Sequence, residues 1–297
     1  MGRKLDLLST AERAGRWVLN LRGFRSRAVP TTAGLLHVYD ARGPRELPTI
    51  VLLHGLGSAA TAFGPLLTRL LPHAGRVMAP DLPGHGFSHA PTATLTPARL
   101  YSALCEVLAA LVPEPMVLVG TSLGGALALR YALEHPARLA ALALISPAGA
   151  QMTPSEWDDL RSIFAIDSAD GARRLLERLY HRAPWYLSVL APGLRNVMQR
   201  AAVRDVMGAA TPDDLPTPDG LRQLSMPILL LWGQSERLLP ASSLSYFRRH
   251  LPEHAVIEEP AGFGHSPHFD DPARLAARLL AFARSSAPAG LEAGSSR

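Results

Sequence analysis

The chain has 297 residues, of which 47% are hydrophobic and 19% charged, as in a folded globular protein. No apolar run approaches the roughly 20 residues of a membrane-spanning helix, so none is expected. The net charge of +5 comes from residues 1–30, which hold seven basic and two acidic side chains. Residues 31–297 hold 23 basic and 23 acidic side chains and are formally neutral. This distribution argues against a nucleic-acid-binding surface on the body of the protein. The single cysteine, Cys105, excludes an intramolecular disulfide.

Residues 1–30 are predicted to form a basic amphipathic arm. After a capping-box sequence at Ser9–Glu12, apolar residues recur at helical spacing: Ala11, Ala14, Val18 and Leu21. Such a stripe either packs on the body of the protein or lies on a membrane surface, and the sequence leaves both alternatives open. Polar residues interrupt the arm, which does not fit a signal peptide. We therefore expect a cytoplasmic protein, with peripheral membrane contact through residues 1–28 as one of the two alternatives.

From Leu35 onward, strands alternate with helices, which is typical of a mainly parallel sheet covered on both faces. Apolar runs predict strands at residues 35–39, 49–53, 76–79, 116–120, 139–145, 227–232 and 255–259. Helical patterns predict helices at residues 100–111, 122–134, 241–250 and 272–283.

The alternation stops between Pro147 and Leu224, where helical segments, aromatic residues and prolines predict an inserted helical cap. The chain is therefore divided into an arm and three further parts: an α/β core at 31–146 and 225–284, a cap at 147–224, and a disordered tail at 285–297. The cap residues Trp185, Tyr186 and Met198 are candidates for the substrate pocket.

The most informative motif lies at residues 117–126, where a strand turns into a helix at Ser122. The turn holds its central residue in a strained conformation, and Gly120 and Gly124 leave the space that side chains would otherwise fill. Ser122 Oγ is thereby raised above the sheet, beside a helix N-terminus that favours negative charge. The motif predicts a nucleophilic serine, although a glycine-rich connection with a serine N-cap has the same pattern. The other loops decide between the two.

Two more loops supply an oxyanion site and a base. His54-Gly55-Leu56-Gly57 follows an early strand, and the backbone N–H groups of Leu56 and Leu123 would together bind the oxyanion of a tetrahedral intermediate. His54 is expected to hold this turn and to border the substrate rather than to act in catalysis. His265 precedes the last helix and is the predicted general base, with His268 as a loop or pocket-rim residue.

Glu236 is the candidate acid, because it follows the strand predicted at 227–232. Its carboxylate would accept the Nδ1 proton of His265 and stabilise the imidazolium. The alternative is that Glu236 only pairs with Arg237 or with solvent. The order Ser122, Glu236, His265 is the order expected for a strand-to-helix serine elbow.

Together these motifs resemble the α/β-hydrolase family over residues 35–284. The carrying motifs are His54–Gly57, Asp81–Ser88, Gly120–Gly125, Trp232–Pro240 and Gly264–His265. The resemblance implies the α/β-hydrolase fold, a mostly parallel central sheet flanked by helices with an inserted helical cap. It also implies that Asp81 and His85 only shape their loop. Such proteins usually carry Asp at position 236, and because Glu is longer by one methylene, its loop must lie slightly farther from His265.

The resemblance implies a serine-dependent carboxylic ester hydrolase, carboxylesterase- or lipase-like, that acts on small or medium-chain apolar acyl esters through an acyl-enzyme. No metal or organic cofactor is expected, and the partner is a small-molecule ester. The cap and the basic arm resemble monoacylglycerol-lipase-type esterases. Two alternatives stay open. The same triad could serve thioester or carbon–carbon hydrolysis, acyl transfer or perhydrolysis, or the fold could bind an apolar ligand without catalysis.

Overall fold

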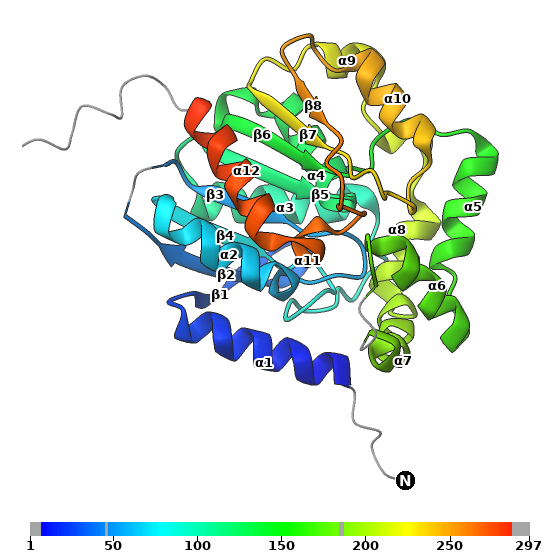
Figure 1. Cartoon of the computed structure of the whole chain (residues 1–297). Coiled ribbons are helices and arrows are strands. Elements are labelled where there is room, and N and C mark those ends of the chain that lie inside the picture. Colours follow the sequence, from blue (N-terminus) through cyan, green and yellow to red (C-terminus); the bar gives the residue numbers. More distant parts are fainter. Residues whose placement is uncertain (1–6, 45–46, 184–186, 287–297) are drawn as a thin grey trace, which may run out of the picture.

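An eight-stranded sheet runs through the centre of the computed structural model, which describes residues 7–44, 47–183 and 187–286 (Figure 1). The strands are β1 (Arg25–Thr31), β2 (Gly34–Arg42), β3 (Ile50–Leu53), β4 (Arg76–Pro80), β5 (Met116–Thr121), β6 (Leu139–Ile145), β7 (Ile228–Leu231) and β8 (Val256–Glu258). Their order across the sheet is β1-β2-β4-β3-β5-β6-β7-β8. β2 is antiparallel to both of its neighbours, and the other pairs are parallel. The expected α/β-hydrolase architecture is therefore confirmed.

Helices cover both faces because alternate side chains of the strands point in opposite directions. On β5, Leu118 joins the apolar cluster beneath one set of helices, whereas Val117 and Val119 join the cluster on the other face. The first set is α3 (Pro97–Leu111), α4 (Leu123–Glu134) and α10 (Ala241–His250), and the second is α2 (Gly64–Leu70) and α12 (Pro272–Ser285). β3, β5 and β7 are buried along their whole length, which is why their sequences are almost continuously apolar.

Between β6 and β7 the chain forms a run of α-helices, of which the first four lie at the right of Figure 1 and the last lies at the top beside α10. They are α5 (Pro154–Phe164), α6 (Ala169–Leu179), α7 (Leu187–Met198), α8 (Ala201–Ala209) and α9 (Pro218–Arg222). The same stretch contains the short helix η4 (Pro212–Asp214), and the short helices elsewhere are η1 (Ala60–Phe63), η2 (Leu71–His73), η3 (Pro136–Arg138) and α11 (Pro267–Asp270). The pocket candidates Trp185 and Tyr186, and residues 287–297 of the expected tail, lie outside the described residues.

The N-terminal region differs from its prediction in two ways. The helix α1 (Leu7–Leu21) already includes Leu7, so Ser9 lies inside the helix and not at its cap. Residues 25–31 are not part of an arm, because they form β1, which pairs with β2 in the central sheet. β1 was missed because only Val29 in it is buried, as suits an edge strand, and its sequence has no apolar run.

The apolar stripe predicted on this helix lies on its solvent-exposed side and does not form its buried contact with the body of the protein. Its four members, Ala11, Ala14, Val18 and Leu21, are all exposed, and Leu19, about a third of a turn around the helix from them, is buried at 1% exposure. Helix α1 therefore packs on the body through a different set of residues. In the part of the chain that is described, no helix is both long and apolar enough to cross a membrane.

Candidate active site

Ser122 occupies a strained turn between β5 and α4. Its backbone φ of 53° lies in the left-handed region, which is rare for a residue with a side chain. A Cβ at Gly120 would lie 2.4 Å from the carbonyl oxygen of Gly124, and a Cβ at Gly124 would lie 2.2 Å from that of Leu53. Both positions therefore require glycine, as the sequence indicated.

Glu236 and His265 form a buried pair behind this turn. His265 Nδ1 lies 2.8 Å from Glu236 Oε2, and the two side chains are 3% and 2% exposed. The other carboxylate oxygen, Oε1, accepts the backbone N–H groups of Leu238 (2.7 Å) and Leu239 (3.0 Å). Burial alone would raise the pKa of Glu236, but the charge and hydrogen bond of His265 and the backbone donors hold this pKa below its usual range. Glu236 is therefore an ionised acceptor whose longer side chain still reaches the histidine.

Arg237 does not compete for this carboxylate. Its guanidinium donates to the backbone carbonyl groups of Tyr180 and His181, just after α6. The alternative in which Glu236 pairs with Arg237 therefore does not describe this structure.

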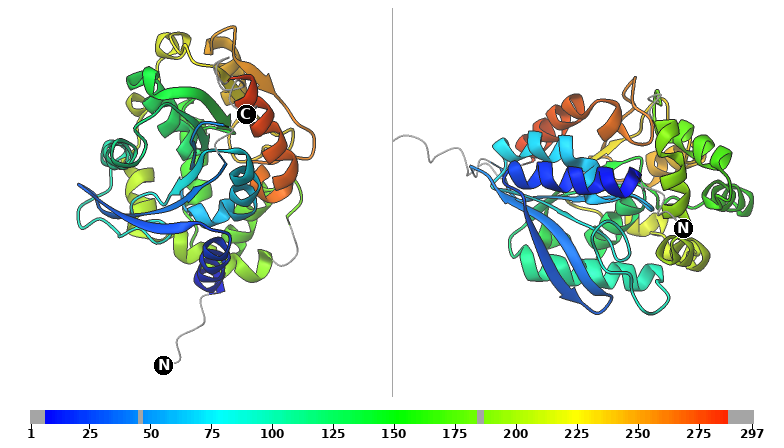
Figure 2. Two further views of the ribbon diagram at one scale, coloured as in Figure 1. Left: turned by 90° about the vertical axis from the view of Figure 1, so that its left-hand side faces the viewer. Right: turned by 90° about the horizontal axis from the view of Figure 1, so that it is seen from below.

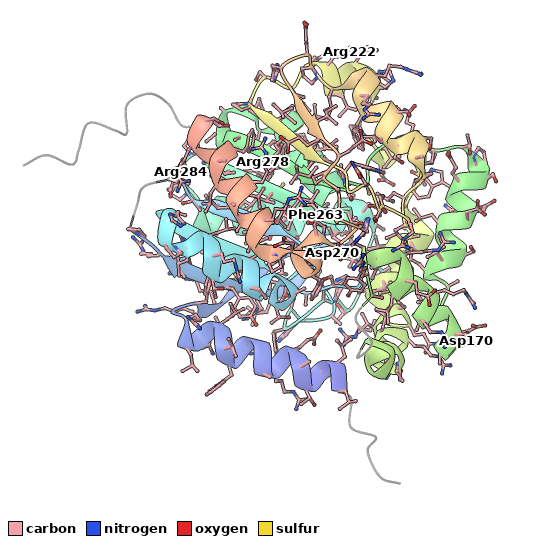
Figure 3. All side chains as sticks on the ribbon, viewed as in Figure 1. Asp170, Arg222, Phe263, Asp270, Arg278 and Arg284 are labelled. Carbon is pink, nitrogen blue, oxygen red and sulfur yellow. The ribbon has the colours of Figure 1, made fainter. Side chains whose placement is uncertain are left out.

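Asp270, which Figure 3 labels on α11, joins the loop that carries His265 to the segment just after α6. Asp270 Oδ2 accepts the N–H of Gly264 (2.7 Å), and Oδ1 accepts that of His181 (2.9 Å). On the other side of the histidine, the N–H of Ser266 donates to the carbonyl oxygen of Leu179 (2.8 Å). No local pattern indicated this role for Asp270, because its partner His181 is 89 residues away along the chain.

Ser122 and His265 both line an apolar cavity of about 310 Å³. The loop after β3 and the cap helices α6 and α7 supply much of its wall, and Met198 is the predicted pocket residue that the structure places there. The opposite wall comes from α1, through Leu8, Ala11, Glu12 and Gly15. A contribution from the N-terminal helix was not expected, because no local pattern tells which distant surface a helix will meet.

A second apolar cavity, of about 110 Å³, also reaches Ser122. It extends between α4 and the cap, where Trp157 and Met207 line it. Leu56, Phe164 and Leu238 border both cavities. The serine therefore lies where two apolar spaces meet.

The two predicted oxyanion donors lie beside the serine. Leu123 is the first residue of α4, and the first N–H groups of a helix have no acceptor within it. Leu56 lies in the turn after β3, and a Cβ at the preceding Gly55 would be 3.1 Å from Ser122 Cβ. Both leucines line the smaller cavity together with Ser122. This proximity is what an oxyanion site needs, and the donor role itself stays a prediction.

His54 is placed differently from a pocket residue. It is 1% exposed, its Nε2 accepts the N–H of Leu82 (3.0 Å), and its Nδ1 donates to the carbonyl oxygen of Gly55 (2.8 Å). Because both ring nitrogens are used inside the protein, His54 holds the turn and has no polar group left for a substrate. His268 is a buried residue of the larger cavity's wall rather than of its rim, with 5% exposure.

Asp81 organises the turn after β4. Its carboxylate accepts the N–H groups of Ala60 (2.7 Å) and Phe87 (3.0 Å) and contacts His37 Nδ1 at 2.9 Å. A Cβ at Gly86 would lie 2.2 Å from this carboxylate, so the loop closes tightly around it. These contacts agree with the shaping role that the resemblance implied.

The chain belongs to the alpha/beta hydrolase family, which matches residues 50–278. Esterases and lipases of that family are among the proteins to which it is similar. A pimeloyl-[acyl-carrier protein] methyl ester esterase of Xanthomonas campestris pv. campestris is 33% identical over 251 residues, covering 79% of this chain and 95% of the relative. A bacterial membrane phospholipase A has a similar structure, with a TM-score of 0.77, 25% identity and coverage of 95% and 93%. Carboxylesterase CesB of Bacillus subtilis shares the fold at a TM-score of 0.72, with 21% identity and coverage of 92% and 98%.

Proposed function

We propose that the protein hydrolyses carboxylic esters through an acyl-enzyme on Ser122. The observation that carries this proposal is the buried His265–Glu236 pair at 2.8 Å, with His265 and Ser122 in the wall of one apolar cavity. The ester-cleaving activity named for the Xanthomonas relative, 33% identical to this chain, supports the same reaction class.

In the proposed reaction, Ser122 Oγ attacks the ester carbonyl carbon while His265 Nε2 takes the hydroxyl proton. The backbone N–H groups of Leu56 and Leu123 stabilise the oxyanion, and Glu236 stabilises the imidazolium. When the tetrahedral intermediate collapses, His265 gives the proton to the leaving alcohol. A water molecule then attacks the acyl-enzyme with the same proton transfers, which releases the carboxylic acid and restores Ser122.

The two cavities support an ester with apolar groups on both sides of its carbonyl. The leaving oxygen has to reach the proton on His265, so the alcohol group belongs in the 310 Å³ cavity that His265 lines. The acyl chain then occupies the 110 Å³ cavity beside Leu123, a size that suits the small or medium chains expected from the sequence.

A fluorophosphonate probe tests the nucleophile directly. The intact protein should be labelled, and Ser122→Ala should lose both labelling and esterase turnover, by a factor on the order of 10⁶ in kcat. Ser58→Ala is the matched control, because Ser58 lines the same cavity and should be labelled like the wild type. If Ser122→Ala is labelled equally well, the mechanism is wrong.

Substrate profiling separates ester hydrolysis from the other reactions that a serine triad can serve. Esters of an apolar alcohol should be cleaved with a higher kcat/KM than thioesters or carbon–carbon substrates of the same acyl group. A protein that only binds apolar ligands would leave both the probe and every substrate unreacted.

A further inference from the structure

Helix α1 has two apolar sides that meet different surroundings. Its inner side lines the larger cavity through Leu8 and Gly15, and it packs closely on η1, since a Cβ at Gly15 would lie 3.7 Å from Thr61 Cβ. Its outer side presents Trp17 and Leu21, each 65% exposed, together with Val18 at 47% and Leu7 at 45%. In the view from below, no other described element lies in front of α1 (Figure 2).

The outer apolar stripe is bordered by positive charge. At the 100° per residue of a helix, Leu7, Val18 and Leu21 fall within about 60° of one another, with the exposed Arg13 and Arg22 on opposite sides of this sector. Arg16 lies on the inner side and stacks on the ring of Phe87 at 4.7 Å, which fixes the helix to the body. The excess charge of the whole chain lies in residues 1–30. An apolar stripe between basic side chains is complementary to the surface of an anionic lipid bilayer.

The cavity opens along this same helix. Ala11 on α1 and Phe269 on α11 line the cavity wall and are both exposed, so the mouth borders both helices and on the α1 side runs beside the outer stripe. A bilayer in contact with Trp17, Val18 and Leu21 would therefore face the mouth of the cavity. An apolar ester could then move from the lipid to Ser122 with little exposure to water.

We propose that α1 docks the protein on an anionic lipid surface through Leu7, Trp17, Val18 and Leu21, with Arg13 and Arg22 against the headgroups, and so places the mouth of the larger cavity at the bilayer. Only the delivery of substrate rests on the function proposed above. The docking surface does not depend on it.

Flotation with phosphatidylcholine vesicles, with and without phosphatidylglycerol, tests the docking. The full chain should bind the vesicles that contain phosphatidylglycerol, and high salt should weaken this binding. Trp17→Ser combined with Leu21→Ser should weaken it by more than about tenfold, because two large side chains no longer enter the lipid. Val256→Ser is the matched control: Val256 is 44% exposed but lies on β8, far from α1 in Figure 1, and its loss should change nothing.

Tryptophan fluorescence locates the contact. Trp185 lies outside the described residues, so the measurement is made on a Trp185→Phe background. The emission should shift to the blue on vesicle binding, and adding Trp17→Phe should keep the binding but lose most of the shift, because Trp157 and Trp232 are buried. Ser122→Ala should bind like the wild type, so a failure of the proposed catalysis would not be mistaken for a failure of docking.

Three outcomes would overturn the proposal. The wild type could fail to float with anionic vesicles, or the double variant could float as well as the wild type. The third is that the double variant converts a dimer into a monomer in light scattering while vesicle binding is unchanged. In that case the stripe is covered by a second copy of the chain.

Discussion

Replacing Glu236 with Gln tests the catalytic geometry most sharply, because the surroundings of this side chain dictate how an amide would be oriented. Oε1 accepts two backbone N–H groups, from Leu238 and Leu239, so the amide oxygen of Gln must take that place. The NH₂ group then points at His265 Nδ1, where the carboxylate Oε2 lies at 2.8 Å in the native protein. A donor at this position forces Nδ1 to accept, and the ring proton moves to Nε2.

A histidine protonated at Nε2 cannot take the proton of Ser122. We expect kcat to fall by about 10⁴, which is about 5 kcal/mol of transition-state stabilisation. KM should change little, because the altered group lies behind His265 as seen from the substrate. The assay is steady-state hydrolysis of a p-nitrophenyl ester of an apolar acid, with urea unfolding measured on the same preparation to show that the fold is retained.

Glu236→Asp is the matched control for charge. It keeps the carboxylate but shortens the side chain by one methylene, so the acid can no longer hold both backbone donors and still reach the histidine. We expect an intermediate loss of about 10²-fold, the usual effect of a misplacement of about 1 Å. If a well-folded Glu236→Gln variant keeps kcat within about tenfold of the wild type, Glu236 does not orient the base, and the reasoning from the structure fails.

Three further predictions concern stability and specificity. Gly124→Ala should lower the free energy of unfolding, measured in urea, by more than about 2 kcal/mol, because there is no room for the added Cβ. Gly208→Ala is the control: its Cβ would enter open space on α8, so the free energy of unfolding should not fall. Equal effects of the two substitutions would contradict this prediction. Burial lowers the pKa of His268 to about 3 in the folded protein, whereas the pKa of a histidine in the unfolded chain is about 6.5. Below about pH 6.5 the unfolded chain therefore binds a proton that the folded protein does not, and the free energy of unfolding falls as the pH is lowered. His268→Leu should therefore show a smaller loss of stability between neutral and acid pH, and an unchanged pH dependence would refute this origin. Leu176 lines the larger cavity, so Leu176→Trp should reduce kcat/KM for esters of long alcohols. Trp157 lines the smaller cavity, so Trp157→Ala should allow longer acyl chains to be cleaved. If both substitutions changed the selectivity for the same side of the ester, the assignment of the two cavities would be wrong.

The core of the fold and the members of the candidate triad could be predicted because their signals are local. Ser122 is flanked by glycines that the turn requires, and His265 and Glu236 each follow a strand pattern in the chain order of this fold. The structure adds that Glu236 is held by two backbone donors, which lets a longer acid replace the usual Asp. No local pattern predicts that arrangement, because it depends on the path of the whole loop.

The contributions of α1 and Asp270 could not be predicted for a different reason. The sequence showed one apolar stripe on the helix, and in the structure that stripe is exposed while a neighbouring side, with Leu19, packs on the body of the protein. Helical periodicity identifies a face but does not tell whether the face is covered. Asp270 looked like one of several polar residues in a loop, and its role depends on His181, which only the tertiary fold brings near.

The connections between the cap and the two catalytic loops bear on how a substrate reaches Ser122. The segment that follows α6 binds the acid loop through Arg237 and the base loop through Asp270 and the N–H of Ser266. Moving this end of α6 away from the core would break hydrogen bonds on both sides of the Glu236–His265 pair. Opening of the cap at this end would therefore disturb the catalytic geometry at the moment when the substrate arrives.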